Sequence, residues 1–368
     1  MSATGGPMER APPPMATVSL QAIPLSLSPI KESGEKSYLC NSHNDNNLTM
    51  ARFFDISDWE EHEYMSTGGT RDKAVVEDAQ DGQLYFFKTS LKKKEKDYTY
   101  EFWSEIIASE IGRLLGFDTL VYDVAAKKQT LGCLSKLMID PSREQLDEGY
   151  KWIKRYQDAY DSEDRDAYTF QIIDSALNNL FKGEGFTEKL IATLVFDSII
   201  GNEDRHQENW GIIVSTTITD VSRGFLFSRK TPVPKTTYRF APIYDSGSSL
   251  GRELREEKVN QMLTDKVQLE AYINRGQSEI HWKGEHGKQK HFELLDKIAG
   301  FGYGNVIAKE INRIRELYDK ERLSCIVLHI DDCLPEAFGS QKIPEKRKDL
   351  LIKLLTLRIE RLLSLHYE

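Results

Sequence analysis

Hydrophobic and polar residues follow patterns typical of strands and one long helix in the first part of the chain. Short apolar runs bounded by turn residues predict strands at 74–77, 84–89, 121–124 and 131–138. Asp81-Gly82 is a hairpin turn signal between the first two of these strands. Apolar residues at helical spacing over 102–115 predict a helix that ends at Gly116. We therefore expect a strand-rich region up to residue 140.

The second part of the chain is predicted to be mainly helical. Apolar residues at helical spacing predict helices at 147–166, 170–181, 187–200, 256–262, 266–273, 292–298, 307–317 and 346–365. The helix at 187–200 leads into the polar turn 201–209, and a strand is expected at 210–214. The segment 215–238 is predicted to be either an excursion that contacts substrate or a simple surface hairpin.

Composition and charge narrow the class of protein. Residues 1–50 are rich in Pro, Ser, Asn and Gly with few large apolar side chains, so we expect a disordered leader. The net charge of −9 argues against a nucleic-acid partner, which favours a basic surface. No apolar run approaches the roughly 18 residues of a membrane span. The four scattered cysteines form no CxxC pair and fit a reducing compartment, so a cytoplasmic protein is expected.

The segments GNEDRHQENWG and APIYDSGSSL, which begin at Gly201 and Ala241, carry the candidate chemistry. Transfer of the terminal phosphoryl group of ATP needs a carboxylate base, oxygen ligands for Mg²⁺ and a cation on the phosphates. Asp204 can be the base, while Asn209 and Asp245 can hold the metal. An Asp-x4-Asn spacing alone is usually only a turn. Its place between an apolar helix and a strand, followed by Asp-x-Gly, favours a phosphotransferase.

The first part of the chain supplies candidate phosphate-binding groups. Lys88 ends an apolar strand, where a buried ammonium needs a partner or a ligand. A segment rich in small residues precedes the first strand, and glycine there lets backbone N–H groups approach phosphate oxygens. Its predicted nucleotide-covering residues are Ser66, Thr67, Gly68, Gly69 and Thr70.

These segments resemble the catalytic and metal-binding motifs of the HipA-like serine/threonine kinases, in particular the short cell-translocating kinase type. The similarity covers residues 60–365. It implies an α+β, bilobal, protein-kinase-like fold with a small β-rich N-lobe over 51–140 and a larger, mainly helical C-lobe over 141–368. It also implies ATP and Mg²⁺ as cofactors, a protein substrate and a serine/threonine kinase activity.

The resemblance implies further roles. Glu105 is the expected partner of Lys88, with Glu101 as the second choice, because Glu105 precedes Gly116 by the family's spacing. Lys136 and Leu137 fall at the adenine-facing hinge, and Lys73 and His206 are expected to contact the nucleotide. Members of the family can phosphorylate their own glycine-rich loop, which makes the hydroxyls of Ser66, Thr67 and Thr70 autophosphorylation candidates.

Other functions fit parts of the sequence. Phosphatidylinositol kinases share an Asp-Arg-His-x-x-Asn loop, so a lipid kinase is one alternative, and a catalytically silent nucleotide-binding module is another. Residues 247–251 match the G-x-S-x-G motif of hydrolases around Ser249, but the charged segment that follows opposes that reading. Full-length HipA kinases carry an extra amino-terminal subdomain, and its absence here argues against an antitoxin partner. The resemblance is compatible with action in the cell's own cytoplasm or with export into another cell.

Overall fold

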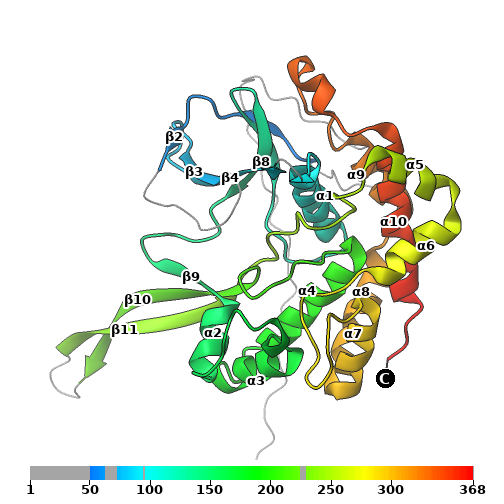
Figure 1. Ribbon diagram of the computed structural model, residues 1–368. Coiled ribbons are helices and arrows are strands. Elements are labelled where there is room, and N and C mark those ends of the chain that lie inside the picture. The colour runs from blue at the N-terminus through cyan, green and yellow to red at the C-terminus, as the bar shows by residue number, and fades with distance from the viewer. Residues whose placement is uncertain (1–49, 63–72, 94–95, 224–228, 368) are drawn as a thin grey trace, which may run out of the picture. The chain divides into compact units, whose positions relative to one another are not determined.

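A six-stranded sheet forms the first part of the structure (Figure 1). The computed structural model describes residues 50–62, 73–93, 96–223 and 229–367, so the predicted leader lies almost entirely outside them. The strand order is β1-β7-β8-β4-β3-β2, and β1 and β7 are the parallel pair. The strands are β1 Phe53–Asp55, β2 Glu60–Glu61, β3 Lys73–Glu77, β4 Leu84–Thr89, β7 Asp123–Lys127 and β8 Thr130–Lys136.

The predicted hairpin is confirmed as β3 and β4. Gly82 adopts a φ of 69° in the turn, a left-handed conformation that glycine reaches without steric cost. The register places Lys73 directly opposite Lys88, and residues opposite each other in an antiparallel pair share one face of the sheet. The lysine-rich segment that follows contains the short strands β5 Lys92–Lys93 and β6 Lys96–Asp97.

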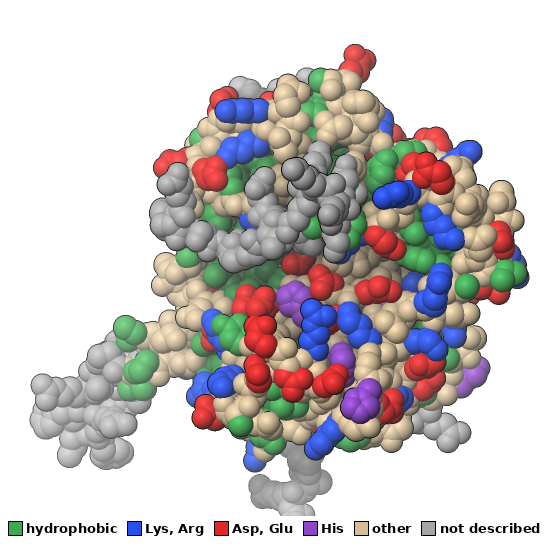
Figure 2. All heavy atoms as spheres, viewed as in Figure 1, with side chains coloured by type: hydrophobic (Ala, Val, Ile, Leu, Met, Phe, Trp, Pro, Cys, Tyr) green, Lys and Arg blue, Asp and Glu red, His purple; other side chains and the backbone are tan. Residues whose placement is uncertain are grey.

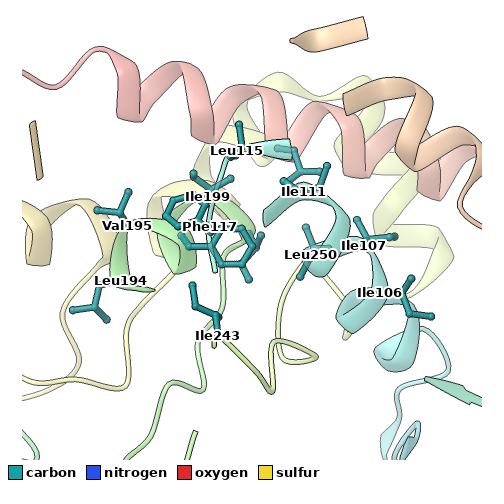
Figure 3. Packing of buried hydrophobic residues seen from close by; sticks show 14 of the residues in the cluster. Ile106, Ile107, Ile111, Leu115, Phe117, Leu194, Val195, Ile199, Ile243 and Leu250 are labelled. Atoms are coloured by element: carbon teal, nitrogen blue, oxygen red, sulfur yellow. The ribbon is translucent and has the colours of Figure 1, made fainter. Parts of the chain in front are cut away.

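Helix α1, Glu101–Leu114, joins the sheet to the helical part of the chain. All of its residues except Arg113 are buried. Gly116, with a φ of 74°, ends the helix as predicted, and the Phe117 amide donates back to the Gly112 carbonyl at 2.8 Å. Figure 3 shows Ile107 and Ile111 of α1 in the same apolar cluster as Val195 and Ile199 of α4. The hydrophobic core is therefore continuous from α1 into the helical part.

The remaining helices pack around α4, Phe186–Ile200, of which 12 of 15 residues are buried. They are α2 Gly149–Tyr156, α3 Phe170–Leu180, α5 Glu256–Thr264, α6 Lys266–Arg275, α7 His291–Ile298, α8 Gly304–Leu317, α9 Lys320–His329 and α10 Glu345–Leu363. Helix α9 was not predicted, and α2 ends at Tyr156, ten residues before the predicted end at Asp166. No helix within the described residues has the length and apolar content needed to cross a bilayer.

A second sheet of three strands carries a long hairpin. Its strands are β9 Glu144–Glu148, β10 Gly211–Arg223 and β11 Arg229–Phe240, in the order β11-β10-β9. The segment 215–238 therefore lies in a β-hairpin, and its contact with substrate stays a prediction. Strand β9 overlaps the start of the helix that was predicted over 147–166. Strand β9 pairs with Gly211–Ser215 of β10, so the hairpin extends well beyond it.

The cysteines differ from the simple expectation of four reduced thiols. Cys133 and Cys333 are free and buried. Burial raises the pKa of Cys333 to about 12, so its thiol stays protonated near neutral pH. Cys325 is disulfide-bonded, which the spacing of the cysteines did not predict.

Candidate active site

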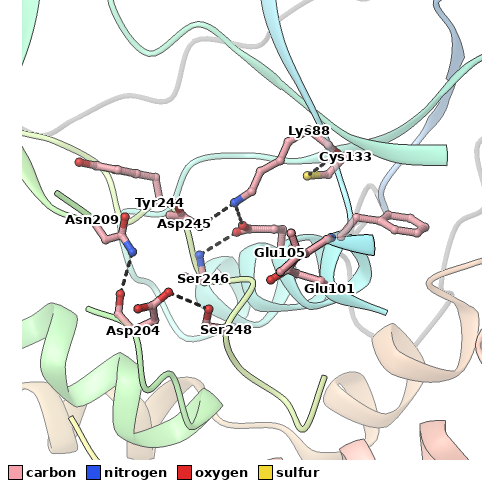
Figure 4. A network of polar contacts seen from close by, with 12 residues as sticks. Lys88, Glu101, Glu105, Cys133, Asp204, Asn209, Tyr244, Asp245, Ser246 and Ser248 are labelled. Carbon is pink, nitrogen blue, oxygen red and sulfur yellow. Dashed lines mark hydrogen bonds and ion pairs between the residues drawn. The ribbon is translucent and has the colours of Figure 1, made fainter. Parts of the chain in front are cut away.

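Lys88, Glu105 and Asp245 meet in a buried ion cluster although they are far apart in sequence (Figure 4). The Lys88 ammonium donates to Glu105 Oε1 at 2.5 Å and to Asp245 Oδ1 at 2.6 Å. Their side chains are 5%, 0% and 21% exposed. Buried charges are stable only when they are paired and hydrogen-bonded, and here two carboxylates flank one ammonium. The predicted pairing of Lys88 with Glu105 is therefore present.

Glu105 also fixes the segment that carries Asp245. Its Oε2 accepts a hydrogen bond from the Ser246 amide at 2.7 Å, which links α1 to this segment. A side chain at Gly247 would place its Cβ 2.8 Å from Glu105 Oε1, so glycine is required for this approach. Glu101, the second choice as partner of Lys88, accepts instead from the Leu91 amide at 2.9 Å and pairs with Arg252.

Asp245 has an unusual backbone conformation. Its φ is 52°, in the left-handed region that residues other than glycine seldom occupy, although aspartate tolerates it better than most. Such conformations persist where surrounding contacts hold them, and they are common at functional sites. Here the Asp245 carboxylate accepts from the Lys88 ammonium, and the next backbone amide, that of Ser246, donates to the Glu105 carboxylate.

Helix α4 delivers the polar turn that contains Asp204. The helix ends at Gly201, whose φ of 67° turns the chain and whose amide donates to the Asp197 carbonyl. A Cβ at Gly201 would lie 2.8 Å from the Arg358 guanidinium, so a side chain is excluded there. Asn209 donates through Nδ2 to the backbone carbonyl of Asp204 at 2.7 Å, which fixes the two ends of the turn against each other.

Arg205 organises this turn, and the sequence analysis assigned it no role. Its guanidinium is fully buried and donates to both carboxylate oxygens of Asp197, at 2.9 and 2.8 Å. It also donates to the carbonyls of Asn209 and Tyr244, at 2.7 and 2.6 Å. Burial lowers the pKa of Arg205, but the charge of Asp197, the hydrogen bonds to Asp197 and the charge of Asp245 together raise it above its usual value. One cation thus connects α4, the Asp204 turn and the segment before Asp245.

Asp197 and Asn202 brace the turn. Asn202 donates through Nδ2 to Asp197 Oδ1 at 3.0 Å, and its own Oδ1 accepts from the Asp204 amide at 3.3 Å. Both residues are buried. The Asp204 carboxylate is only partly buried, and its Oδ2 accepts from the Ser248 hydroxyl at 3.0 Å.

A cavity of about 730 Å³ opens beside the ion cluster. This volume lies within the range of small-molecule sites. Six predicted residues line it, namely Lys73, Lys88, Lys136, Leu137, Asn209 and Asp245. Apolar side chains such as Leu120 and Met138 form other parts of the wall, and they suit a planar base. The cavity therefore combines an apolar region with lysines and metal-binding oxygens.

Several lining residues were not predicted. Tyr122 is buried against the cluster, and burial, followed by the charge of Glu105, raises its pKa well above the usual value. Others are Glu148 at the end of β9, Tyr150 in α2, Glu208 in the Asp204 turn and Tyr244 directly before Asp245. The pKa of Glu148 is raised by burial and then by the charge of Glu208. No local sequence pattern marks these residues, because they meet only after β9 joins β10.

Other predicted residues lie elsewhere or outside the described residues. His206 is not among the side chains that line the cavity, and its Nδ1 accepts from the Glu208 amide at 3.2 Å. The nucleotide-covering residues Ser66, Thr67, Gly68, Gly69 and Thr70 lie outside the described residues. At the expected hinge, the Leu137 amide donates to the Leu84 carbonyl, and Arg239 donates to the Met138 carbonyl at 2.8 Å.

The hydrolase alternative does not fit the structure around Ser249. This serine is 2% exposed, and its hydroxyl donates to the Ser246 carbonyl at 2.6 Å. A nucleophile elbow needs an exposed serine at the start of a helix. The next helix, α5, begins only at Glu256.

Two solved structures were found to be similar to this chain. The fold is similar to that of the Helicobacter pylori proinflammatory kinase CtkA, with a TM-score of 0.65 and 20% identity over 86% of this chain and 100% of that chain. HipA of Shewanella oneidensis MR-1, solved with HipB and operator DNA, has a TM-score of 0.43 and 12% identity over 81% and 64% of the two chains, which is too slight to support an argument. No family model and no curated protein matches the sequence.

The chain therefore has an α+β, bilobal, protein-kinase-like fold. Within that class, its fold is similar to that of CtkA, and the predicted resemblance to HipA-like kinases of the cell-translocating type is confirmed at the level of the fold. The predicted lobe boundary near residue 140 stays a prediction.

Proposed function

We propose that this protein is an ATP- and Mg²⁺-dependent serine/threonine protein kinase. The observation that supports the proposal best is the buried cluster of Lys88, Glu105 and Asp245 at the wall of a cavity that Asn209 also lines. A lysine held by a helix glutamate, beside one carboxylate and one amide, matches the parts that phosphoryl transfer needs.

Asp245 and Asn209 would hold the metal ion. Within the described residues, no group of three or more His, Cys, Asp or Glu side chains could hold a metal by itself. Magnesium is commonly bound by one or two carboxylates together with substrate phosphates and water, so a sparse donor set suits it. When bound, Mg²⁺ neutralises phosphate charge. The lysines would act with it, because Lys73 and Lys88 share one face of the β3–β4 pair.

Asp204 would take the proton of the acceptor hydroxyl. In that step, the O–H bond of the acceptor breaks and its oxygen bonds to the γ-phosphorus of ATP, while the bond to the bridging oxygen breaks and ADP leaves. Asp204 does not itself line the cavity, but Asn209, which does, donates to the Asp204 carbonyl at 2.7 Å. The chain's contribution is mainly placement and charge neutralisation.

The test is transfer of label from γ-labelled ATP to three samples: a cell lysate, a lipid panel and the protein alone. Asp204→Ala should reduce transfer by roughly a hundredfold or more, since general bases contribute that much. Asp158→Ala is the control, because Asp158 is an exposed loop residue away from the cavity. Full activity of Asp204→Ala would remove the assignment, and labelled lipid alone would identify a lipid kinase instead. Binding of ATP without any transfer would identify a silent module.

The same proposal includes a class of substrate and a site of autophosphorylation. The net charge of −9 favours a protein substrate over nucleic acid, and on the face seen in Figure 2 the described acidic and basic side chains lie close together. Autophosphorylation would fall on Ser66, Thr67 or Thr70, where added negative charge would repel the ATP phosphates. Mass spectrometry after incubation with ATP tests this, and an unmodified loop in active protein would reject it.

A further inference from the structure

Ser248 lies where the segment after Asp245 passes the Asp204 turn. Its hydroxyl donates to Asp204 Oδ2 at 3.0 Å, and 44 residues separate the two in sequence (Figure 4). The residue is 9% exposed. Among the described residues, Ser248 is the hydrogen-bond donor to this carboxylate.

The backbone around Ser248 is fixed against the same turn. The Glu203 amide donates to the Ser248 carbonyl at 3.3 Å, and the Leu250 amide donates to the Ile200 carbonyl at 3.0 Å. The Ser104 hydroxyl of α1 donates to the Ser249 carbonyl at 3.2 Å. Ser248 is therefore anchored on both sides, and its hydroxyl reaches Asp204 from a fixed position.

We infer that Ser248 is a positioning residue that orients the Asp204 carboxylate for proton transfer. The inference rests on the proposed kinase function. A hydrogen bond to Oδ2 restricts rotation of the carboxylate group. Oδ1 is then the oxygen that takes the proton of the substrate hydroxyl. Hydrogen bonds to charged groups are among the stronger ones in proteins, so this contact can decide the orientation of the base.

The position of Ser248 also allows a competing role. A hydroxyl that donates to the base stands where an acceptor hydroxyl would stand, so Ser248 could itself receive phosphate. The tight anchoring of its backbone and its burial favour the positioning role, because an acceptor must align with the γ-phosphate and then accommodate the added group. Mass spectrometry distinguishes the two roles.

The test compares Ser248→Ala and Ser248→Thr with Ser249→Ala. Ser249 is the matched control, since it is the adjacent buried serine and its hydroxyl donates to the Ser246 carbonyl rather than to Asp204. The rate of label transfer from γ-labelled ATP is measured with whichever acceptor the wild type labels, together with KM for ATP and the melting temperature.

We expect Ser248→Ala to lower kcat roughly ten- to a hundredfold while KM for ATP changes less than about twofold. Ser248→Thr keeps the hydroxyl and should retain more of kcat than Ser248→Ala. Ser249→Ala should keep kcat within about threefold even if it melts earlier, since it removes no contact to the base.

Three outcomes would overturn the inference: an unchanged kcat in Ser248→Ala, an equal loss of kcat in Ser249→Ala, or phosphate on Ser248 of the wild type. If Ser248→Thr melts far below the wild type, the comparison of the two alanine variants decides. An inactive wild type would instead contradict the proposed function, so the two failures are distinguishable.

Discussion

Arg205 shows how one residue can organise a site without contacting a ligand. It is the fully buried cation whose five donors reach Asp197, two backbone carbonyls and, at 3.4 Å, the Ser246 hydroxyl. The sequence did not predict this role, because two of the partners, Tyr244 and Ser246, lie 39 and 41 residues further along the chain. The spacing of nearby residues can suggest catalytic residues, but it cannot reveal hydrogen bonds between residues that are far apart in sequence.

Replacing Arg205 should therefore cost stability as well as activity. Arg205→Ala leaves the Asp197 carboxylate buried without its ion-pair partner, and such losses cost about 3–5 kcal/mol. Arg205→Lys keeps the charge but loses the planar fork, so we expect a smaller loss. Urea denaturation measures both.

The control is Arg143→Ala, whose ion pair with Asp140 is largely exposed and contributes little. An unfolding free energy of Arg205→Ala within about 1 kcal/mol of the wild type would contradict this role of Arg205. Loss of one partner of a buried ion pair should lower the unfolding free energy by more than that.

The helices and strands that the sequence predicted correctly are those with a clear apolar periodicity. Helices α1 and α4 are long and largely buried, and a glycine follows the end of each. Their bounds were therefore predicted closely. Strand β9 was not predicted, because its EQLDE sequence is mostly polar and its pairing with β10 comes from far along the chain. Helix α9 has a stripe of only three buried residues, which is too short a pattern to stand out.

Helix α7 begins with a histidine that should make folding sensitive to acid. Burial and, to a smaller extent, the nearby charge of Arg358 lower the pKa of His291 to about 3. Because the folded pKa lies below the usual 6.5, the folded state resists a proton that the unfolded chain accepts. The unfolding free energy is therefore highest above pH 6.5, and protonation of His291 in the unfolded chain lowers it as pH falls towards 3.

The loss from His291 should reach about 2 kcal/mol between pH 7 and pH 5. His291→Gln does not titrate, so its unfolding free energy should fall less over this interval than that of the wild type. Chemical denaturation at the two pH values gives the difference. Equal slopes in the two proteins would show that the ring is not kept neutral by folding.

At the scale of the whole molecule, the sheet and the helical part share both a core and a charge cluster. The apolar cluster runs from α1 to α4, while Lys88 and Glu105 from the first part hold Asp245 from the second. The resemblance to kinases predicted this two-part plan, and it could do so because the motifs mark the ends of elements that meet at the cleft. The wall formed by Glu148 and Tyr150 was not predictable, since it depends on β9.

A ligand that contacts both parts should stabilise them together. The cavity takes Lys88 and Leu137 from the first part and Asn209 and Asp245 from the second, so ATP with Mg²⁺ should bind only the folded molecule. At a hundred times Kd, such a ligand adds about 2.7 kcal/mol to the unfolding free energy. Because the core is continuous, we expect one melting transition that moves as a whole.

Differential scanning calorimetry with ATP and Mg²⁺, with ATP and a chelator, and without ligand measures this linkage. Asp245→Asn keeps the size of the side chain but loses the charge that would hold the metal, so the Mg²⁺-dependent part of the shift should disappear. A wild type with two transitions, of which ATP moves only one, would mean that the ligand contacts a single part of the chain. In that case, Lys88 of β4 and Asp245 would not bind the same ligand, although their side chains are in contact.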